Sequence, residues 1–545
     1  MRVDAASNAT TKNVDILIVG SGPIGATFAR TLVDAGRKVL MIDVGDQVTR
    51  LIGDHRKNSM AVQRDISLFT NSVKAQLHPL SVPTNTVESY LEPASWAPTP
   101  DQLSYVQNGQ NPDQKSWDNL PAAAATRVVG GMGSHWTCCT PRQHPKIERS
   151  TLFDDAEWDE LYTKSEKMLN TNSTSFDDSI RQQLVKHVLT DEFKDEGRKI
   201  SSMPLACKRS EKNKEYVRWS CAATILDDLS DPKYGGGSFE ILPNTQCLEL
   251  QLDSTDNQVA WALVKDILED RKYYIKANKY VICAGAVLTP GILFASNFTK
   301  DLLPALGHYM TEQAMAFCQV ILKTSLVDSV KDDPYGLGWK AKVDAHKAKA
   351  PKDPLPFPFE DPDPQCYFPL TADHPWHTQI HRDSFGYGEV PATIDQRLVV
   401  DFRWFTYVKP VKENYVEFSK ECKDEFGMPQ PTFHFRLSEE DSDRSLRMVT
   451  DMVDVARRLG GFLPGAEPKY LAPGSALHIC GTYRAGKSNK DSVVDRFGKV
   501  WGQDDLVLGG CGVIPTQNAS NPTITAMCFA LAAARQMVDD LEKQK

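Results

Sequence analysis

A glycine-rich turn near the start of the chain has the residue types and the spacing of a nucleotide-phosphate site. Gly20, Gly22 and Gly25 form the pattern GxGxxG, and Asp43 stands 23 residues after the first of them. Glycines at these positions permit a tight turn, a close approach of the backbone to a pyrophosphate, and close packing of helix on strand. The N-terminus of the following helix favours phosphate charge, and the acid is placed to bind ribose hydroxyls. The pattern predicts a dinucleotide site without distinguishing FAD from NAD.

The residues around this turn predict the elements that must position it. Residues 14–19 form an apolar, β-branched run, residues 23–35 are typical of a helix, and residues 38–42 predict a second strand that ends at Asp43. Further strands are predicted at 240–252, 260–276, 280–285 and 506–510. The last of these leads into an alanine-rich helix that begins near Pro522. Both chain ends and the middle therefore contribute to one Rossmann-like domain in a mixed α/β (α+β) fold.

The rest of the chain is predicted to form an inserted domain, built on a mainly antiparallel sheet with helices. The nucleotide-binding domain is expected to comprise residues 13–75, 120–145, 236–311 and 471–545. The inserted domain is expected to comprise residues 76–119, 146–235 and 312–470. Within it, residues 330–364 include a proline- and lysine-rich stretch that predicts an exposed arm, because proline removes ladder donors and stiffens the chain.

Composition excludes several classes of protein. The chain has 545 residues, with 62 Lys and Arg against 71 Asp and Glu, a formal charge of −9 that argues against a nucleic-acid binder. No apolar run approaches the ~18 residues of a membrane span. The 12 cysteines are sparse and lack metal-ligand spacing, so we predict free thiols and no metal site. Residues 1–13 lack the apolar core of a secretory leader, which favours a cytoplasmic or periplasmic location.

Five segments, in order along nearly the whole chain, carry a family resemblance. They are TRVVGGMGSHWTCCT at 126–140, PWHTQIHRDSFGYG at 375–388, GMPQPTF at 427–433, GGFLPG at 460–465, and GGCGVIPT followed by NPTITAM within 509–527. Together they resemble the fungal pyranose 2-oxidases, members of the glucose–methanol–choline (GMC) oxidoreductase superfamily. The resemblance implies FAD as the cofactor and makes the inserted domain a substrate-binding domain.

The resemblance also implies how the flavin is held. His135 matches the residue that bonds covalently to the flavin 8α carbon, although Gly133–Ser134 precedes it where the family has Ser–Thr. The alternative is a histidine packed beside a non-covalent flavin. Thr137 is similar to the threonine whose hydroxyl lies near flavin N5. The fingerprint and the resemblance together assign the following residues to the cofactor: Gly20, Gly22, Gly25, Asp43, Arg127, Gly131, Met132, His135, Trp136, Thr137, Cys247, Ala284, Gly510, Pro522 and Thr523.

Two residues match the catalytic pair of the family. Oxidation of a sugar alcohol removes a hydroxyl proton and a carbon-bound hydride, and a histidine is suited to take the proton. The resemblance implies that His478 is this base and that Asn521 hydrogen-bonds the reacting oxygen. Because 43 residues separate them, only the fold can bring them together. Tyr483 and Ala485 stand where the family has histidine and methionine, which leaves the base itself unchanged.

The substrate side of the site follows from the same comparison. Carboxylate, amide and guanidinium groups recognise sugar hydroxyls, and an aromatic ring lies against the C–H face. The residues that match the sugar contacts of the family are Gln379, Asp383, Tyr387 and Arg403, and Phe385 matches the gating residue of the substrate loop.

The sequence therefore predicts an FAD-dependent sugar oxidase. It would oxidise an aldopyranose such as D-glucose at C2 and pass the electrons to O₂, forming H₂O₂, or to a quinone. The alternatives are a glycoside or C-glycoside 3-oxidase, a quinone-dependent sugar dehydrogenase, and a protein that binds FAD without turnover. The segment that would form the oligomerisation arm, 330–351, is shorter than the family pattern, so a homo-tetramer, a homodimer and a monomer all stay open.

Overall fold

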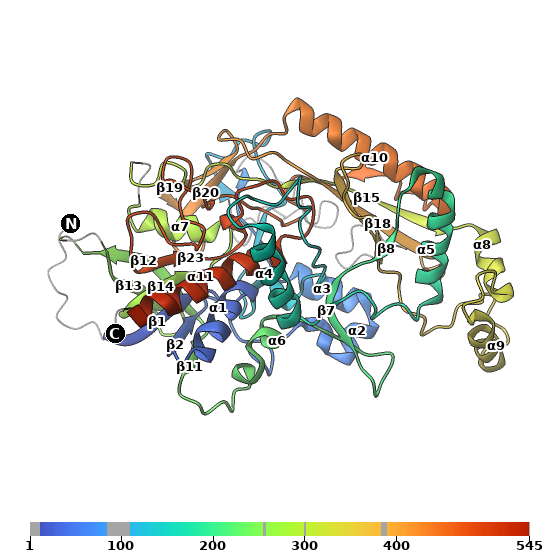
Figure 1. Ribbon diagram of the computed structural model, residues 1–545, viewed down its shortest axis with the longest axis horizontal. Helices are drawn as coiled ribbons and strands as arrows, with labels where there is room; N and C mark the ends of the chain where they lie inside the picture. The colour runs from blue at the N-terminus through green and yellow to red at the C-terminus, as the bar shows by residue number, and fades with distance from the viewer. Residues whose placement is uncertain are drawn as a thin grey trace, which may run out of the picture.

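Two β-sheets lie one beyond the other along the long axis of the molecule (Figure 1). The computed structural model of the chain describes residues 11–83, 110–253, 255, 258–298, 301–382, 388 and 390–543. Its α-helices are α1 Pro23–Asp34, α2 Met60–Arg64, α3 Ile66–Lys74, α4 Asp155–Met168, α5 Ile180–Glu192, α6 Ala222–Leu226, α7 Leu288–Ala295, α8 Thr324–Ser329, α9 Trp339–Lys349, α10 Glu439–Leu459 and α11 Thr523–Lys543.

The first sheet is the predicted nucleotide-binding sheet. Its strands, in spatial order, are β11 Phe239–Leu242, β2 Val39–Ile42, β1 Thr11–Val19, β14 Arg271–Ile282, β13 Val259–Asp266 and β12 Thr245–Leu252. Strand β23, Leu506–Leu508, pairs with the end of β14. The pairs from β11 to β14 and the pair of β14 with β23 are parallel, whereas β12, β13 and the start of β14 form an antiparallel meander. Strands from both ends and from the middle of the chain thus build this sheet, as the sequence predicts.

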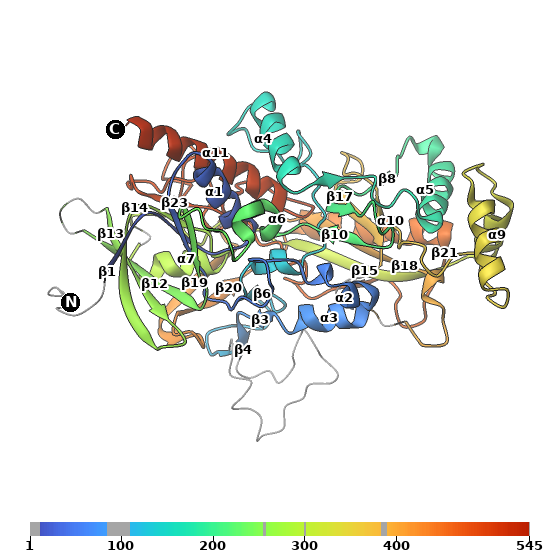
Figure 2. The ribbon, with the colours of Figure 1, turned by 90° about the horizontal axis from the view of Figure 1, so that it is seen from below.

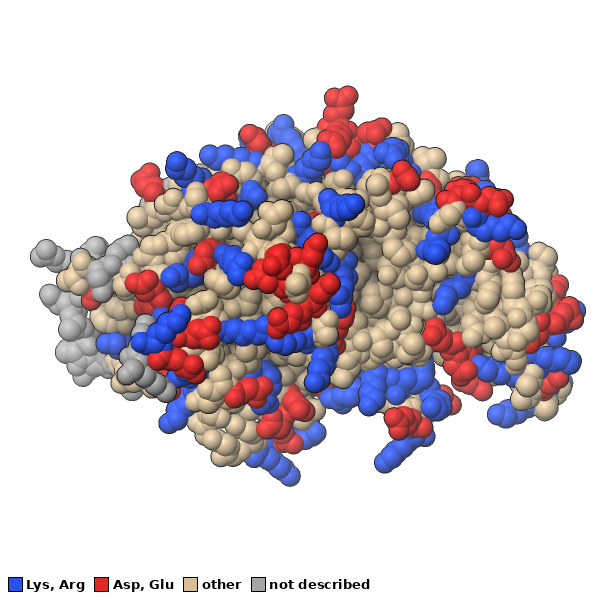
Figure 3. Space-filling view, viewed as in Figure 1, with Lys and Arg blue, Asp and Glu red and all other residues tan. Residues whose placement is uncertain are grey.

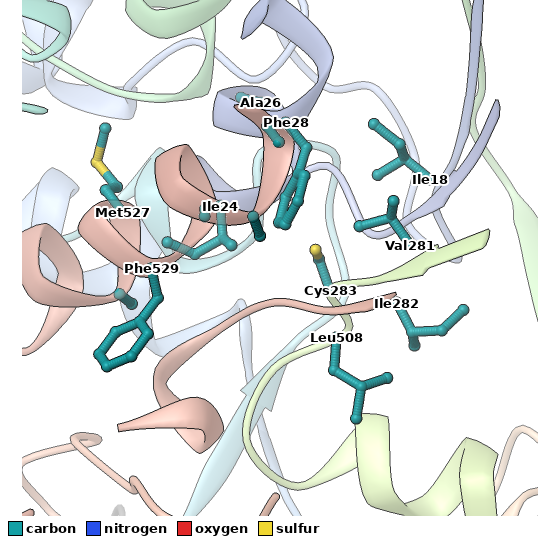
Figure 4. Packing of buried hydrophobic residues seen from close by; sticks show 14 of the residues in the cluster. Ile18, Ile24, Ala26, Phe28, Val281, Ile282, Cys283, Leu508, Met527 and Phe529 are labelled. Atoms are coloured by element: carbon teal, nitrogen blue, oxygen red, sulfur yellow. The ribbon is translucent and has the colours of Figure 1, made fainter. Parts of the chain in front are cut away.

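Helices α1 and α11 cover one face of the first sheet and close its core (Figures 1 and 4). Phe28 on α1 and Phe529 on α11 are both buried, and the sheet below presents Ile18 from β1 and its register partner Val281 from β14. Burial of each large apolar side chain contributes about 1.5–3 kcal/mol. This packing fixes the N-termini of both helices above the carboxyl ends of the parallel strands.

The second sheet is antiparallel throughout, as predicted for the inserted domain. Its order is β21 Gly460–Phe462, β15 Gln313–Leu322, β18 Val399–Tyr407, β17 Trp376–His381, β16 Cys366–Tyr367 and β8 Ser201–Ser202, and β22 Lys469–Tyr470 also pairs with β15. The long helix α10 packs on β15 and β18, with Met448, Met452, Val455 and Leu459 at the spacing of one helical face.

Smaller strand pairs connect the two sheets. They are the hairpin β19 Tyr415–Lys423 with β20 Pro429–His434, the group β7 Thr171–Asn172, β9 Leu205–Arg209 and β10 Val217–Trp219, and the pairs β3 Leu77–Pro79 with β6 Ala124–Thr126 and β4 Val82–Pro83 with β5 Gln110–Asn111. Figure 2 shows α4 beside α11 on one side of the molecule and α2 and α3 on the other.

Residues 330–364 pack against the second core instead of forming the predicted exposed arm. Residues 339–349 form helix α9, and Trp339 is fully buried in the second core. Farther along, Asp361 is buried and pairs with Arg181, so this stretch is anchored as well. Helices α8 and α9 project at the end of the molecule, but as packed helices instead of an extended arm (Figure 1). The oligomeric state stays a prediction.

The predicted domain boundaries also differ from the packing in two segments. Residues 153–176 and 203–229 were assigned by sequence to the inserted domain, yet Trp158 and Trp219 belong to the first core. Helix α4, which carries Trp158, packs against α11. The sequence pattern could not show this, because an amphipathic helix does not specify which core it covers.

The surface and the cysteines agree with the composition. On the face shown in Figure 3, basic and acidic side chains are interspersed. All 12 cysteines are free thiols. Within the described part of the chain, no helix combines the length and the apolar character needed to span a bilayer.

Candidate active site

A cavity of about 300 Å³ lies at the carboxyl ends of the parallel strands, between the N-termini of α1 and α11. Such crevices are the usual ligand sites of open α/β sheets. Twelve of the fifteen residues that the sequence assigned to the cofactor line it. They are Gly20, Gly22, Asp43, Arg127, Gly131, Met132, Trp136, Cys247, Ala284, Gly510, Pro522 and Thr523. The other three are Gly25, His135 and Thr137, which lie outside its lining.

The glycine-rich turn has the close packing that its pattern predicts. Gly20 has φ +101°, and a Cβ there would lie 2.4 Å from the carbonyl oxygen of Cys283. A Cβ on Gly25 would lie 2.0 Å from the carbonyl oxygen of Gly20. Gly25 therefore contributes by allowing α1 to start directly against the turn, instead of by lining the cavity. The helix N-terminus faces the cavity through Gly22 and Pro23.

Asp43 is tied to the glycine-rich turn from the end of β2. One carboxylate oxygen accepts hydrogen bonds from the backbone N–H of Ser21 at 2.9 Å and from its hydroxyl at 2.6 Å. The other oxygen accepts from the backbone N–H of Gly45 at 2.8 Å. Burial raises the pKa of Asp43, and these hydrogen bonds oppose the shift. A carboxylate has about four acceptor positions, so one remains for a ribose hydroxyl in the cavity.

His135 lies directly behind the cavity wall. Its Nε2 is 3.0 Å from the hydroxyl of Thr126, which lines the cavity, and its Nδ1 is buried with no hydrogen-bond partner in the described part of the chain. Burial lowers the pKa of His135 to about 4, so the ring is neutral at neutral pH. A neutral imidazole with an unsatisfied nitrogen is the form that can bond to a flavin methyl carbon.

Glu312, which lies just before β15, and Gln313, its first residue, hold His478 at the wall of the cavity. The backbone N–H of His478 donates to the buried carboxylate of Glu312 at 2.5 Å. The imidazole Nδ1 lies 2.8 Å from Oε1 of Gln313. Leu477 has φ +60°, a left-handed conformation that costs energy in a branched residue and persists only where its surroundings impose it. The ring of His478 is thus positioned by the second sheet and faces the cavity of the first.

A chain of hydrogen bonds joins His478 to the second sheet. Asn521 Nδ2 lies 3.1 Å from His478 Nε2, and Asn521 Oδ1 accepts from Gln379 Nε2 at 2.8 Å. Arg403 donates to Gln379 Oε1 from Nε at 3.1 Å and from a terminal nitrogen at 2.8 Å. The structure therefore brings together four residues that the sequence placed in one site, from β17, β18, the loop before α11 and the loop after β22.

The electrostatic environment keeps His478 neutral. Removal from bulk water, reinforced by the positive charge of Arg403 and by His377, lowers the pKa of His478 to about 3. The ring therefore carries a free lone pair over the whole physiological range and can accept a proton. Burial raises the pKa of the Glu312 carboxyl to about 7. This carboxyl is held in place by hydrogen bonds from the backbone N–H groups of Gln313 and His478.

A second, more polar cavity of about 170 Å³ adjoins the first. Thr137, Gln379 and Arg403 line it, and Trp136 lines both cavities. Lys57, Arg209, Glu215, Glu360 and Asp363 also line this cavity. The predicted substrate residues Asp383, Phe385 and Tyr387 lie outside the described residues. The described part of the predicted sugar site thus adjoins the predicted catalytic pair.

Tyr483, which stands where the family has histidine, packs inside the protein. Its ring is fully buried, and its hydroxyl donates to the carbonyl oxygen of Gly509 at 3.1 Å. A Cβ on Gly512 would lie 2.1 Å from this ring, and a Cβ on Gly510 would lie 2.5 Å from its hydroxyl. The tyrosine therefore packs beneath the glycine loop that leads to the cavity, and its ring is absent from the lining of that cavity.

Three residues that support the site from outside both cavities were not predicted from the sequence. Glu312 and Gln313 follow each other at the start of β15, and His377 lies two residues before Gln379 on β17. The alternation of β17 could have indicated His377, because residues i and i+2 share one face of a strand. Glu312 and Gln313 gave no such signal, because their partner His478 lies 166 and 165 residues away in the sequence.

His55 also was not assigned, and its role makes a stability prediction. Its Nε2 bonds to the carbonyl oxygen of Trp136 at 2.9 Å, and its Nδ1 accepts from the backbone N–H of Lys57 at 3.1 Å. Burial lowers the pKa of His55 to about 3. The unfolded chain takes up a proton here below pH ~6.5 and the folded chain does not, so stability is lost as the pH falls from about 6.5 towards 3.

We expect the stability advantage of the wild type over His55→Gln to shrink by roughly 1.4 kcal/mol per pH unit below pH ~6. Urea unfolding of both proteins at pH 7.5, 5.5 and 4.5 measures this difference. A difference that is constant with pH would contradict a neutral buried His55.

The residues around the first cavity fit an FAD. The glycines of the turn and Gly131 leave room for a backbone cradle, Asp43 keeps an acceptor position, and two helix N-termini offer positive potential for the pyrophosphate and for the flavin. His478 lines the same cavity as Pro522 and Thr523 at the start of α11, so the predicted base would face a cofactor bound there.

Comparisons with known proteins agree with this geometry. The family model described as GMC oxidoreductase matches residues 410–530. A pyranose 2-oxidase from Lyophyllum shimeji is 41% identical over 97% of this chain and 92% of that protein. A pyranose 2-oxidase from Emericella nidulans is 41% identical over 98% of this chain and 94% of that protein. A C-glycoside 3-oxidase from Microbacterium trichothecenolyticum is 27% identical over 97% of each chain.

Solved structures share the fold. A formate oxidase superposes with a TM-score of 0.66 over 99% of this chain and 100% of that chain, at 13% identity. The cavity between α1 and α11, the full-length relatives and the common fold lead to one conclusion. The chain is an FAD-dependent oxidoreductase that acts on CH–OH groups, and it belongs to the pyranose 2-oxidase branch of the GMC oxidoreductase family.

Proposed function

We propose that the protein is a sugar oxidase that converts an aldopyranose such as D-glucose to its 2-keto sugar and reduces O₂ to H₂O₂. The hydrogen-bonded series His478–Asn521–Gln379–Arg403, at the junction of the cofactor cavity and the polar cavity, supports this most strongly. The names of the 41% identical relatives support the substrate class and the position of attack.

The chemistry needs a base and a hydride acceptor. Bound FAD supplies the acceptor at its N5 position. His478 takes the hydroxyl proton at a ring nitrogen, which its low pKa of about 3 leaves unprotonated. Asn521 lies against the same ring and can donate a hydrogen bond to the sugar oxygen as its proton leaves.

Gln379 and Arg403 orient the sugar from the second sheet. Arg403 is nearly fully buried, and it already donates twice to Gln379, which fixes the amide toward Asn521. Guanidinium and amide groups held in this way offer donors and acceptors to vicinal hydroxyls without losing much rotamer freedom on binding. Asp383 and Tyr387 are proposed as further sugar contacts, and Phe385 as the gate of the loop.

The test is anaerobic mixing of the purified holoenzyme with D-glucose, followed by analysis of the product. We expect the flavin absorbance near 450 nm to bleach and the product to be the 2-keto sugar. Exclusive formation of a 3-keto product, from glucose or from a C-glycoside, would replace the proposal with a glycoside 3-oxidase, for which the 27% identical relative is the specific precedent. Absence of bleaching with any sugar or glycoside would leave an FAD-binding protein without this activity.

The acceptor is tested separately. We expect the reduced enzyme to be reoxidised by O₂ with stoichiometric H₂O₂. Reoxidation by a benzoquinone that is fast, with O₂ slower by orders of magnitude, would favour a quinone-dependent dehydrogenase.

We further propose that His135 is bonded covalently to the flavin. The neutral ring and an Nδ1 that has no hydrogen-bond partner within the described residues support this bond. Acid precipitation of the wild type is expected to leave the yellow colour in the pellet, and His135→Ala is expected to release it to the supernatant. His144→Ala, a substitution outside both cavities, is the matched control and should behave as the wild type. A colourless wild-type pellet would show that the flavin is not covalently bound.

A further inference from the structure

We propose that Gln313 is a positioning residue that holds His478 as the tautomer protonated at Nδ1, which reserves the Nε2 lone pair for the substrate proton. The inference rests on the proposed function, because it states which atom of the proposed base reacts. It assigns a role to a residue outside both cavities.

The amide of Gln313 has a single orientation that satisfies its surroundings. Its Nε2 donates to the carbonyl oxygen of Asn518 at 2.9 Å and to that of Ser520 at 2.8 Å. Both N–H groups of the amide are therefore used. A flipped amide would place Oε1 against two carbonyl oxygens inside the protein, where unpaired acceptors are costly because Gln313 is only 4% exposed. Oε1 must therefore face the other way.

In that orientation, Oε1 of Gln313 meets His478 Nδ1 at 2.8 Å. An amide oxygen can only accept, so the hydrogen of this bond belongs to Nδ1. A neutral imidazole has one N–H, and the hydrogen bond at one ring nitrogen determines the state of the other. His478 Nε2 is thus the unprotonated nitrogen.

The partner on the opposite side of the ring requires the same tautomer. Asn521 Oδ1 accepts from Gln379, so its Nδ2 is the atom that faces His478 Nε2, at 3.1 Å. An amide nitrogen is a donor only, and Nε2 must accept from it. Two independent amides therefore fix one protonation pattern. In that pattern Nε2 carries the lone pair beside Asn521.

Gln313 also connects the two parts of the catalytic pair. The carbonyl groups that it binds belong to Asn518 and Ser520, which lie three residues and one residue before Asn521. On the other side, backbone bonds of 3.0 Å in both directions between Thr311 and Cys480 place the His478 loop against the same strand. One buried side chain at the start of β15 therefore sets the distance between the base and its partner asparagine.

The first test is ¹⁵N NMR of the wild-type holoenzyme labelled at the histidine ring nitrogens, with the His478 signals identified by their loss in His478→Ala. We expect the chemical shifts of a neutral ring protonated at Nδ1, unchanged between pH 6 and 8. A ring protonated at Nε2 would overturn the inference, and this measurement needs no variant of Gln313.

The second test is Gln313→Met, which keeps the length of the side chain and removes both the donor and the acceptor. We expect the limiting rate of flavin reduction by D-glucose to fall about 10–100-fold, as is usual for residues that orient a reacting group, with an unchanged apparent Kd for glucose. The matched control is Gln182→Met on α5, which loses a buried amide of similar bonding but does not contact His478. It should react at the wild-type rate.

The outcomes separate this inference from the proposed function. If the wild type is not reduced by any sugar, the proposed function fails, and the NMR result still decides the tautomer. If the wild type is reduced but Gln313→Met reacts as fast, or slows only as much as Gln182→Met, the positioning role is wrong. A fall in rate together with loss of the Nδ1-protonated signature in Gln313→Met supports it.

Discussion

Replacement of His478 by alanine is expected to slow the reduction of the flavin by D-glucose by roughly 10²–10⁴-fold, the usual contribution of a positioned acid–base group. The ring faces the cofactor cavity, its pKa is lowered to about 3, and its nitrogens are held by Gln313 and Asn521. Alanine removes the imidazole nitrogen that is proposed to take the hydroxyl proton. Stopped-flow spectroscopy of the holoenzyme at saturating sugar under anaerobic conditions measures the rate.

The control for this variant is His187→Ala. His187 lies on α5 and stacks on Tyr335, remote from both cavities, and its loss should leave the rate unchanged. A His478→Ala enzyme that is reduced within a few-fold of the wild-type rate would remove His478 from the mechanism. In that case another group would have to accept the proton.

Replacement of Gly25 by alanine is expected to abolish binding of the flavin. The new Cβ would lie 2.0 Å from the carbonyl oxygen of Gly20, which is backbone and cannot move aside as a side chain would. Relief of this contact requires α1 to withdraw from the turn, and the phosphate cradle at the helix N-terminus would be lost with it. We expect the ratio of flavin absorbance to protein absorbance to fall at least about tenfold in the purified variant.

A matched substitution separates this effect from the general cost of replacing a glycine. Gly461 lies on the surface in β21, and a Cβ there would meet nothing within 4 Å. Gly461→Ala should therefore retain a full complement of flavin. A yellow Gly25→Ala protein with normal flavin content would contradict the role of this contact in forming the cofactor site.

The nucleotide-binding half of the fold could be predicted because its signals are local. The glycine turn, its flanking strands and the helix after Asn521 each occupy a short stretch of sequence, and the structure places them in β1, α1, β2 and α11. The boundaries of the inserted domain could not be predicted as well. Trp158 and Trp339 enter different cores, and which core an aromatic side chain enters depends on tertiary packing instead of on a local pattern.

In the candidate site, the residues that belong to a motif could likewise be predicted, and those without a motif could not. His478 and Asn521 were found through their motifs, and the structure brings their side chains within 3.1 Å. Gln313 and Glu312 were not found, because a hydrogen-bond partner has no motif of its own when it lies on a strand far away in the sequence. Whether a polar residue in an apolar strand supports a site is decided by what lies opposite, which only the fold reveals.

The isotope effect on flavin reduction tests the central claim most directly. Anaerobic reduction of the holoenzyme is compared for D-glucose, D-[2-²H]glucose and D-[3-²H]glucose at saturating concentration. If the pair of His478 and Asn521 holds the sugar for oxidation at C2, deuterium at C2 will slow reduction with a primary isotope effect and deuterium at C3 will not. A primary effect from C3 alone, or none from either position in an enzyme that is reduced by glucose, would contradict oxidation at C2.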